Sequence, residues 1–337
     1  MNTKNSYYNP FESMSFSNER CFLCGKKLNI KTNEHVFPKW LLDEFDLWDQ
    51  KITLLNRTKI TYRQLRIPCC KECNNVYLSK IEKRVKKKYF EGFESFLKTK
   101  ELLIYQWVGK IFYGFLFREL SLLIDQSIPE KGNITSPEIL EKFKTLHGFL
   151  QSIRTAFKFE NFKPWSIFIL NLQIDNKLSK FDYHDSLFLL TFSIRMGNIG
   201  IIACLGDNGA QKDIFQNYWK KLQKIKLHPI QFDELYAKVT YKSSLMNRTP
   251  KYITIMPENE YGLTSVIASP LQGLSSKPIY DEWEQKEYAK YLASLLGIYK
   301  LSFNDIFKEP NLVMSFINDE KNRIKVFNHK GEIIKYI

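Results

Sequence analysis

The chain has 337 residues, of which 44% are hydrophobic and 26% charged, and a formal net charge of +14 at pH 7. This is the balance of a soluble globular protein that can bury one large core or two smaller ones. No basic segment followed by an apolar run opens the chain, and charged residues interrupt its most apolar stretch, residues 102–124. The sequence therefore predicts neither a signal peptide nor a membrane span, and we expect a cytoplasmic protein.

Residues 1–18 are polar and aromatic without a period, and we expect a flexible arm there. Two Cys-x-x-Cys pairs follow, formed by Cys21 with Cys24 and by Cys70 with Cys73. Two residues between thiolates let both sulfurs reach one tetrahedral ion, so the pairs predict a structural zinc site. Cys69 is an alternative ligand to Cys70, although the Cys-x-x-Cys spacing favours Cys70. Buried free thiols are the competing interpretation.

The segment between the two pairs contains Glu34 next to His35, and Asn74 directly follows the last cysteine. A neutral imidazole can take a proton from water near neutral pH, and a carboxylate can hold a hard divalent cation. An asparagine at a helix start is most often an N-cap, but the amide oxygen of Asn74 could instead bind a second ion. Neighbours on a regular strand point to opposite faces, so Glu34 and His35 can serve one site only where the strand is distorted or ends.

Residues 76–98 predict a helix whose buried face is formed by Val76, Ile81, Val85 and Phe90. Residues 51–100 hold fourteen lysines and arginines against four glutamates, and such a local field favours a polyanion. A solvated lysine-rich helix would have the same composition. We expect these side chains of the helix to contact phosphates: Lys80, Lys83, Arg84, Lys87 and Lys88.

The sequence strings CFLC, EH and CKECN resemble those of the HNH endonucleases, the ββα-metal superfamily, and within it the endonuclease VII-like type with four cysteines. The resemblance covers about residues 19–90. It implies a structural zinc on Cys21, Cys24, Cys70 and Cys73, a general base at His35, and a catalytic Mg²⁺ or Mn²⁺ ion on Glu34 and Asn74. An aspartate is commoner than a glutamate before the histidine of this family.

Together these features predict a metal-dependent endonuclease that hydrolyses DNA with little sequence specificity, and double-stranded DNA is the form that we expect it to bind. The alternative is a zinc-dependent DNA-binding protein without catalysis. The remaining chain could regulate the nuclease as an effector in antiphage defence, by analogy with other HNH modules. It could also form a homodimer or bind a regulatory protein partner, and no membrane partner is expected.

The fold class that we expect is α+β, with a flexible arm at residues 1–18, a zinc-stapled ββα-metal module at 19–95 and an accessory α+β domain at 96–337. Within the accessory domain the patterns predict helices at residues 101–127, 136–157, 212–226 and 281–299. They predict strands at 165–173, 187–196, 199–205, 236–243 and 251–256, and a closing hairpin of 323–327 with 332–337. We interpret His147, His184, His228 and His329 as surface residues without a catalytic role.

Overall fold

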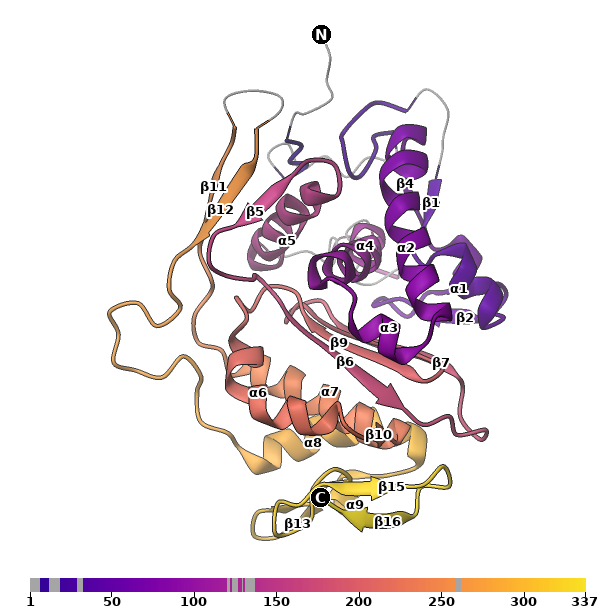
Figure 1. Ribbon diagram of the computed structural model, residues 1–337, viewed down its shortest axis with the longest axis vertical. Helices are drawn as coiled ribbons and strands as arrows, with labels where there is room; N and C mark the ends of the chain where they lie inside the picture. The colour runs from indigo at the N-terminus through magenta and orange to yellow at the C-terminus, as the bar shows by residue number, and fades with distance from the viewer. Residues whose placement is uncertain are drawn as a thin grey trace. The chain divides into compact units, whose positions relative to one another are not determined.

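The computed structural model describes residues 7–11, 19–28, 33–119, 122, 127–128, 130, 137–257 and 262–337. The chain divides into two compact units. The first unit comprises Met1–Glu160 and Ile253–Ile267, and the second comprises Asn161–Tyr252 and Ala268–Ile337. Helices and strands mix in both units (Figure 1), which confirms the α+β class. The predicted arm at 1–18 lies largely outside the described residues.

The first unit begins with short strands around the cysteine pairs. Strand β1 (Asn33–His35) pairs antiparallel with β4 (Arg66–Pro68), and β2 (Lys51–Thr53) pairs antiparallel with β3 (Lys59–Thr61). Helix α1 (Lys39–Glu44) and the 3-10 turn η1 (Tyr62–Gln64) connect these strands. A π-helical stretch, η2 (Cys73–Leu78), leads into α2 (Ser79–Phe90), so the antiparallel pair of β1 and β4 is followed by a helix.

Helices complete the first unit. The predicted helix 76–98 is interrupted at Gly92, whose φ of 91° ends α2 before α3 (Phe93–Leu97) begins. Helix α4 (Glu101–Glu119) is buried on almost every side, and α5 (Pro137–Leu150) packs against it and continues into the 3-10 turn η4 (Gln151–Ile153). A three-stranded sheet in the order β11-β12-β5 is formed by Tyr252–Ile255, Thr264–Ala268 and Phe157–Phe159.

The predicted boundary after residue 95 differs from the structure. Helix α4 packs against α2 and β4, so the first compact unit extends through α4 and α5 to Glu160. The sequence could not indicate this, because α4 is so uniformly apolar that its pattern does not say which neighbour it covers. None of the described helices is long and apolar enough to span a membrane.

The second unit is built on a five-stranded sheet in the order β10-β6-β9-β8-β7. The strands are Lys226–Leu227, Ser166–Leu172, Ile199–Cys204, Thr191–Met196 and Phe181–Ser186. Gly197 adopts a φ of 56° in the β8–β9 turn, and this hairpin and strand β6 confirm the predictions. Helices α6 (Ala210–Leu222), α7 (Pro229–Ser244) and α8 (Gln285–Leu296) lie on one side of the sheet (Figure 1).

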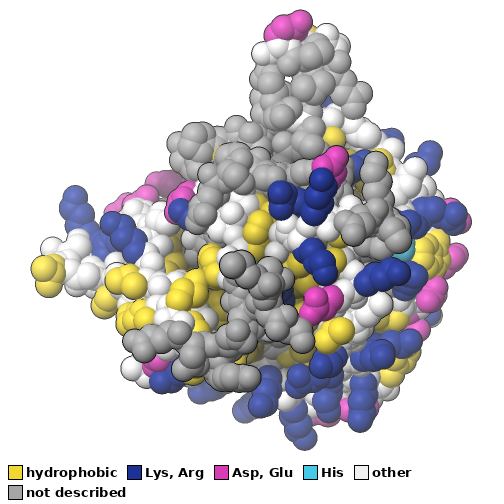
Figure 2. Space-filling model, turned by 90° about the horizontal axis from the view of Figure 1, so that it is seen from above, with side chains coloured by type: hydrophobic (Ala, Val, Ile, Leu, Met, Phe, Trp, Pro, Cys, Tyr) yellow, Lys and Arg dark blue, Asp and Glu magenta, His cyan; other side chains and the backbone are white. Residues whose placement is uncertain are grey.

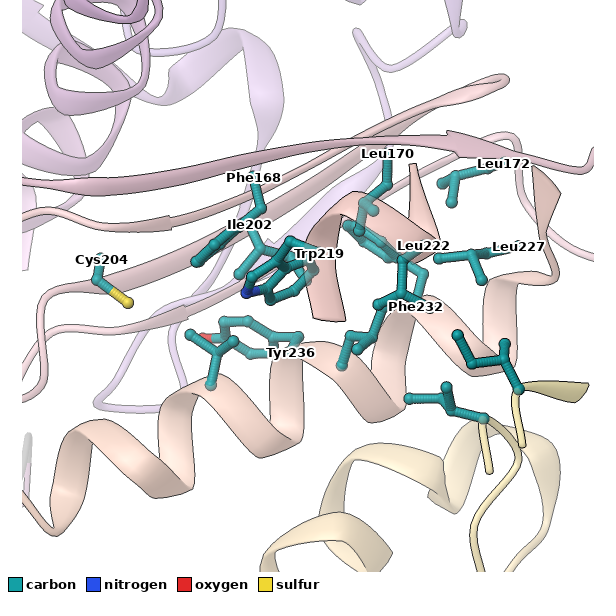
Figure 3. Packing of buried hydrophobic residues seen from close by; sticks show 14 residues of the cluster. Phe168, Leu170, Leu172, Ile202, Cys204, Trp219, Leu222, Leu227, Phe232 and Tyr236 are labelled. Carbon is teal, nitrogen blue, oxygen red and sulfur yellow. The ribbon is translucent and has the colours of Figure 1, made fainter. Parts of the chain in front are cut away.

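An apolar core joins this sheet to its helices. Phe168 of β6 stacks on Trp219 of α6 with ring centroids 3.8 Å apart. Phe232 and Tyr236 of α7 point toward the same strands (Figure 3). A Cβ at Gly200 would lie 2.5 Å from the Phe232 ring, so the close approach of α7 to β9 requires a glycine there.

The predicted strand at 236–243 is wrong, because these residues belong to α7. Its β-branched and aromatic residues favoured a strand, but the helix starts well before them. His228 is its N-cap, Gln231 completes a capping box, and Pro229 occupies the first turn. Tertiary burial on both sides of α7 removes the polar face that would have indicated a helical period.

The chain ends in small elements of the second unit. The 3-10 turn η5 (Gly297–Tyr299) and helix α9 (Phe303–Ile306) follow α8, and β13 (Phe307–Lys308) pairs with β14 (Leu312–Val313). The predicted closing hairpin is confirmed as β15 (Lys325–Phe327) with β16 (Ile333–Tyr336).

Candidate functional site

The four paired cysteines converge in the first unit. The sulfur atoms of Cys21, Cys24, Cys70 and Cys73 all lie within 4.8 Å of one another, and those of Cys24 and Cys70 are 3.7 Å apart. A tetrahedral zinc ion with sulfur ligands at about 2.3 Å separates those sulfurs by about 3.8 Å. The thiols therefore fit one metal ion, as a structural zinc requires. Cys69 is not in this group, because its Sγ points to the Cys70 carbonyl oxygen at 3.6 Å.

Backbone hydrogen bonds hold the first cysteine pair against the strands. The Gly25 amide donates to the Cys21 carbonyl at 2.8 Å, and the Phe22 amide donates to the Pro68 carbonyl at 2.9 Å. Gly25 has a φ of +70°, and a Cβ there would lie 2.4 Å from the Tyr8 ring. The turn that brings the two thiols together is therefore one that only glycine adopts without strain.

Helix α5 holds the same loop from the other side, through a residue that the sequence analysis interpreted as a surface residue. His147 is 1% exposed, and its Nε2 lies 2.8 Å from the Phe22 carbonyl oxygen. Gln151 donates from Nε2 to the Leu23 carbonyl at 3.0 Å. Burial lowers the pKa of His147 to about 4, so the ring is neutral and donates an Nε2 proton to Phe22.

Asn74 lies where the second cysteine pair enters the helix. Its backbone amide donates to the Cys70 carbonyl at 3.0 Å, and the residue is partly exposed. The helical backbone already includes Glu72 and Cys73, so Asn74 is not an N-cap. It belongs instead to the π-helical stretch Cys73–Leu78, a backbone form that often occurs at functional sites.

His35 is the last residue of β1 and is only 8% exposed. Its ring lies edge-on to the Trp48 ring, with centroids 5.4 Å apart, and its buried Nε2 has no hydrogen-bond partner among the described residues. Burial, followed by the positive charge of Arg66, lowers the pKa of His35 to about 4. Arg66 is the cross-strand partner of His35 in β4. The imidazole is therefore neutral at physiological pH.

Glu34 forms an ion pair with a lysine of helix α4. The Lys110 ammonium lies 2.8 Å from Glu34 Oε1 and 3.0 Å from Glu82 Oε1, and Lys110 is 2% exposed. It also donates to the carbonyl oxygens of His35 at 2.6 Å and Val36 at 3.2 Å. Four oxygens thus surround this nitrogen. The Glu34 carboxylate is already neutralised, which does not fit the ligand role that the resemblance implies for it.

The pKa shifts in this buried cluster agree with an ion pair between Glu34 and Lys110. Burial alone would raise the pKa of Glu34, but Lys110 outweighs burial and the pKa is lowered, so Glu34 is ionised. Burial raises the pKa of Glu82; Lys110 opposes this increase and Glu34 adds to it. Burial alone would lower the pKa of Lys110, but the two carboxylates raise it, so Lys110 keeps its charge. Sequence reasoning missed Lys110, although a lone lysine within an apolar helix is a usable signal.

We expect Lys110→Met to lower the free energy of unfolding by about 3–5 kcal/mol, because it leaves a buried carboxylate unpaired. Adding Glu34→Gln should recover part of this loss, since it removes the unpaired charge. Urea denaturation of the full chain measures both variants, with the exposed Lys100→Met as the control. Equal stabilities of Lys110→Met and Lys100→Met would show that the ion pair is not formed.

Helix α2 presents the basic side chains that the sequence assigns to phosphate contact. Lys80, Lys83, Arg84 and Lys87 are exposed, whereas Lys88 is partly buried. The Lys88 ammonium binds Glu91 and Ser95, each at 2.8 Å. Lys and Arg side chains also gather along the margin of the face in Figure 2. Lys80, Lys83 and Arg84 are therefore available to a polyanion, whereas Lys87 pairs with Glu91 at 3.7 Å and Lys88 is held by Glu91 and Ser95.

The predicted apolar face of this helix is only half correct. Ile81 and Val85 are buried, but Val76 is 41% and Phe90 is 56% exposed. The π-helical turn before α2 changes the angular position of Val76 relative to Ile81, which a regular helical period does not anticipate. Phe90 lies beside the Lys86 ammonium, 5.8 Å from the ring centroid.

Comparisons with known proteins give one partial match. A family model described as "Immunity protein YezG-like" matches residues 107–193, about a quarter of the chain. The matched segment excludes all four paired cysteines, Glu34, His35 and Asn74. No curated protein and no solved structure matches the chain.

Proposed function

We propose that the first unit is a zinc-organised endonuclease of the HNH type that hydrolyses phosphodiester bonds, with double-stranded DNA as its substrate. The observation that carries this proposal is the meeting of four thiols beside strands β1 and β4, where β1 ends at a neutral histidine. Four thiolates leave zinc no open position, so zinc organises the backbone and takes no part in hydrolysis.

His35 is the general base in this proposal. Its neutral ring and unpaired Nε2 leave a lone pair that can accept a proton from the attacking water. Nε2 is buried in the structure, so water reaches this atom only after a local rearrangement of its surroundings. Lys110 holds the backbone carbonyl of His35 and so fixes the end of β1.

The catalytic ion of the resemblance needs a different ligand set in this chain. Glu34 is neutralised by Lys110, which leaves Asn74, with its partly exposed amide, as the remaining predicted oxygen ligand. A bound Mg²⁺ or Mn²⁺ ion would supply charge stabilisation at the scissile phosphate. Asn74 would then hold the ion together with phosphate oxygens and water, which are hard ligands that Mg²⁺ accepts.

The exposed basic side chains of α2 supply binding without sequence preference, since backbone contacts carry no base information. We expect the triple variant Lys80→Ala, Lys83→Ala and Arg84→Ala to bind duplex DNA more weakly for every sequence. Each lost phosphate contact should reduce the slope of log affinity against log salt by about 0.9. Fluorescence anisotropy at several salt concentrations measures both effects.

A matched control for this experiment is the triple alanine variant of Lys220, Lys221 and Lys224, exposed lysines of the second unit. The assignment of the basic face to α2 predicts that the control keeps the wild-type affinity and slope. It would be contradicted if the control lost affinity and the α2 variant did not.

Incubation of the zinc-loaded chain with supercoiled plasmid and Mg²⁺ or Mn²⁺ tests the proposed reaction. We expect nicked circles whose ends carry a 5′ phosphate and a 3′ hydroxyl, so that DNA ligase reseals them without further treatment. Nicks that resist ligation would contradict the proposal that the bond between phosphorus and the 3′ oxygen is the one that breaks. A zinc-loaded chain that leaves plasmid intact with both ions would exclude the endonuclease.

The second candidate is a zinc-dependent DNA-binding protein without catalysis, and the Glu34–Lys110 ion pair favours it, because that pair removes one expected ion ligand. The two candidates separate on one comparison. Salt-dependent DNA binding with no nicking supports the binding protein, and binding together with nicking supports the endonuclease. Regulation by the second unit and a role in antiphage defence remain proposals that rest on analogy with other HNH modules.

A further inference from the structure

The second unit contains a cavity of about 310 Å³ beside helices α6 and α7. This volume lies at the lower end of the range for small-molecule sites, about 300–1,000 Å³. Its walls are mainly aromatic and aliphatic. The residues that line it are Ile214, Phe215, Tyr218, Trp219, Leu235, Lys238, Val239, Lys242 and Trp283.

Two lysines lie in this otherwise apolar lining, and they differ in their partners. The Lys238 ammonium binds Glu234 Oε1 at 2.8 Å and is neutralised by it. The Lys242 ammonium lies 4.3 Å from the centroid of the Tyr280 ring and forms no ion pair with a carboxylate among the described residues. Burial lowers the pKa of Lys242, because no carboxylate compensates its lost hydration.

A partly buried ammonium that faces an apolar cavity without a counter-ion favours an anion as the occupant. The rings of Trp219 and Trp283 offer aromatic surface for a planar group, and aromatic pairs gain energy beyond their buried area. A purely apolar occupant would desolvate Lys242 further without compensating its charge. A purely ionic occupant would leave the aromatic lining unused.

We propose that this cavity binds a small aromatic molecule with one anionic group, a carboxylate, sulfonate or phosphate, which pairs with Lys242. A second, more polar cavity of about 530 Å³ shares Lys238 and Trp283 with the first. A ligand longer than the apolar cavity would extend its polar end into this neighbour. The proposal concerns the second unit alone and stands whether or not the first unit hydrolyses DNA.

Two probes that differ only in the anionic group test the proposal on the full chain. 8-Anilinonaphthalene-1-sulfonate carries a sulfonate, and N-phenyl-1-naphthylamine has the same rings without it. We expect the sulfonate probe to bind with one-to-one stoichiometry and about tenfold more tightly, as one charge-assisted contact implies. Titration followed by probe fluorescence, with excitation of tryptophan, measures both affinities.

Two variants of lining residues and one control outside the lining identify the cavity as the binding place. Lys242→Met should abolish the preference for the sulfonate probe, whereas Lys220→Met, an exposed lysine of α6, should keep it. Ile214→Trp should weaken both probes, because this half-exposed side chain lines the cavity and a larger ring would fill it. Equal affinities of the two probes for the wild type would overturn the proposal. Sulfonate binding that is unchanged in both Lys242→Met and Ile214→Trp would overturn it as well.

Discussion

The Cys70→Ser variant is expected to lose the bound metal and to unfold the first unit. Four sulfurs within 4.8 Å of one another leave a site that a hydroxyl cannot complete for zinc. Structural zinc contributes about 10–16 kcal/mol of apparent binding free energy in zinc-finger peptides, and that energy is folding free energy. Metal analysis of the purified chain should find one zinc in the wild type and none in the variant, with faster proteolysis of residues 19–160.

Cys69→Ser is the matched control, since Cys69 is the adjacent buried cysteine whose sulfur lies outside the cluster. It should retain one zinc and wild-type resistance to proteolysis. The opposite result, zinc lost from Cys69→Ser and kept by Cys70→Ser, would mean that Cys69 binds the zinc in place of Cys70. Zinc absent from the wild type would mean that the four thiols are a buried, metal-free cluster.

The His35→Ala variant is expected to lose DNA cleavage while it keeps zinc and DNA affinity. A positioned general base contributes about 10²–10⁴-fold to a rate, so the single-turnover nicking rate should fall by that factor. Zinc should be unaffected, because the His35 side chain is not among the clustered metal-binding groups. His329→Ala, an exposed histidine of the second unit, is the control. Cleavage at the wild-type rate by His35→Ala would remove His35 from the reaction.

The local parts of the candidate site could be predicted from the sequence. The Cys-x-x-Cys spacing determines which thiols reach one ion, and the structure brings together the four that it indicates. The hydrogen bond of the Phe22 amide to the Pro68 carbonyl joins the first cysteine pair to the end of β4, two residues before Cys70. Each Cys-x-x-Cys pair is a local pattern that depends on few residues, and each of these residues is visible in the chain.

The long-range partners could not be predicted in the same way. Lys110 is 76 residues from Glu34 and His147 is 125 residues from Phe22, and no local pattern links the members of either pair. Both partners lie on helices that their own patterns predict, but a helical period does not say which distant segment the buried face covers. The burial of α7 on both sides produced the wrong strand at 236–243, and the uniformly apolar α4 concealed how far the first unit extends.

Strand β7 shows a related limit. The strand Phe181–Ser186 was not predicted, because four of its six residues are polar and its second half, from His184 to Ser186, has no apolar alternation. In the structure His184 lies 3.8 Å from both Asp182 and Asp233, and its ring stacks on Tyr236. It is therefore half-buried within the second unit and not the solvated surface residue that the sequence indicates.

The most direct test of a zinc-organised hydrolytic site is the plasmid-nicking rate as zinc is removed and returned at constant Mg²⁺. Removal by a chelator followed by dialysis should abolish nicking by the wild-type chain, and zinc alone should restore it, because zinc fixes the backbone around Asn74 and β1. Nicking at the full rate without zinc, or no nicking by the zinc-loaded chain, would contradict this function.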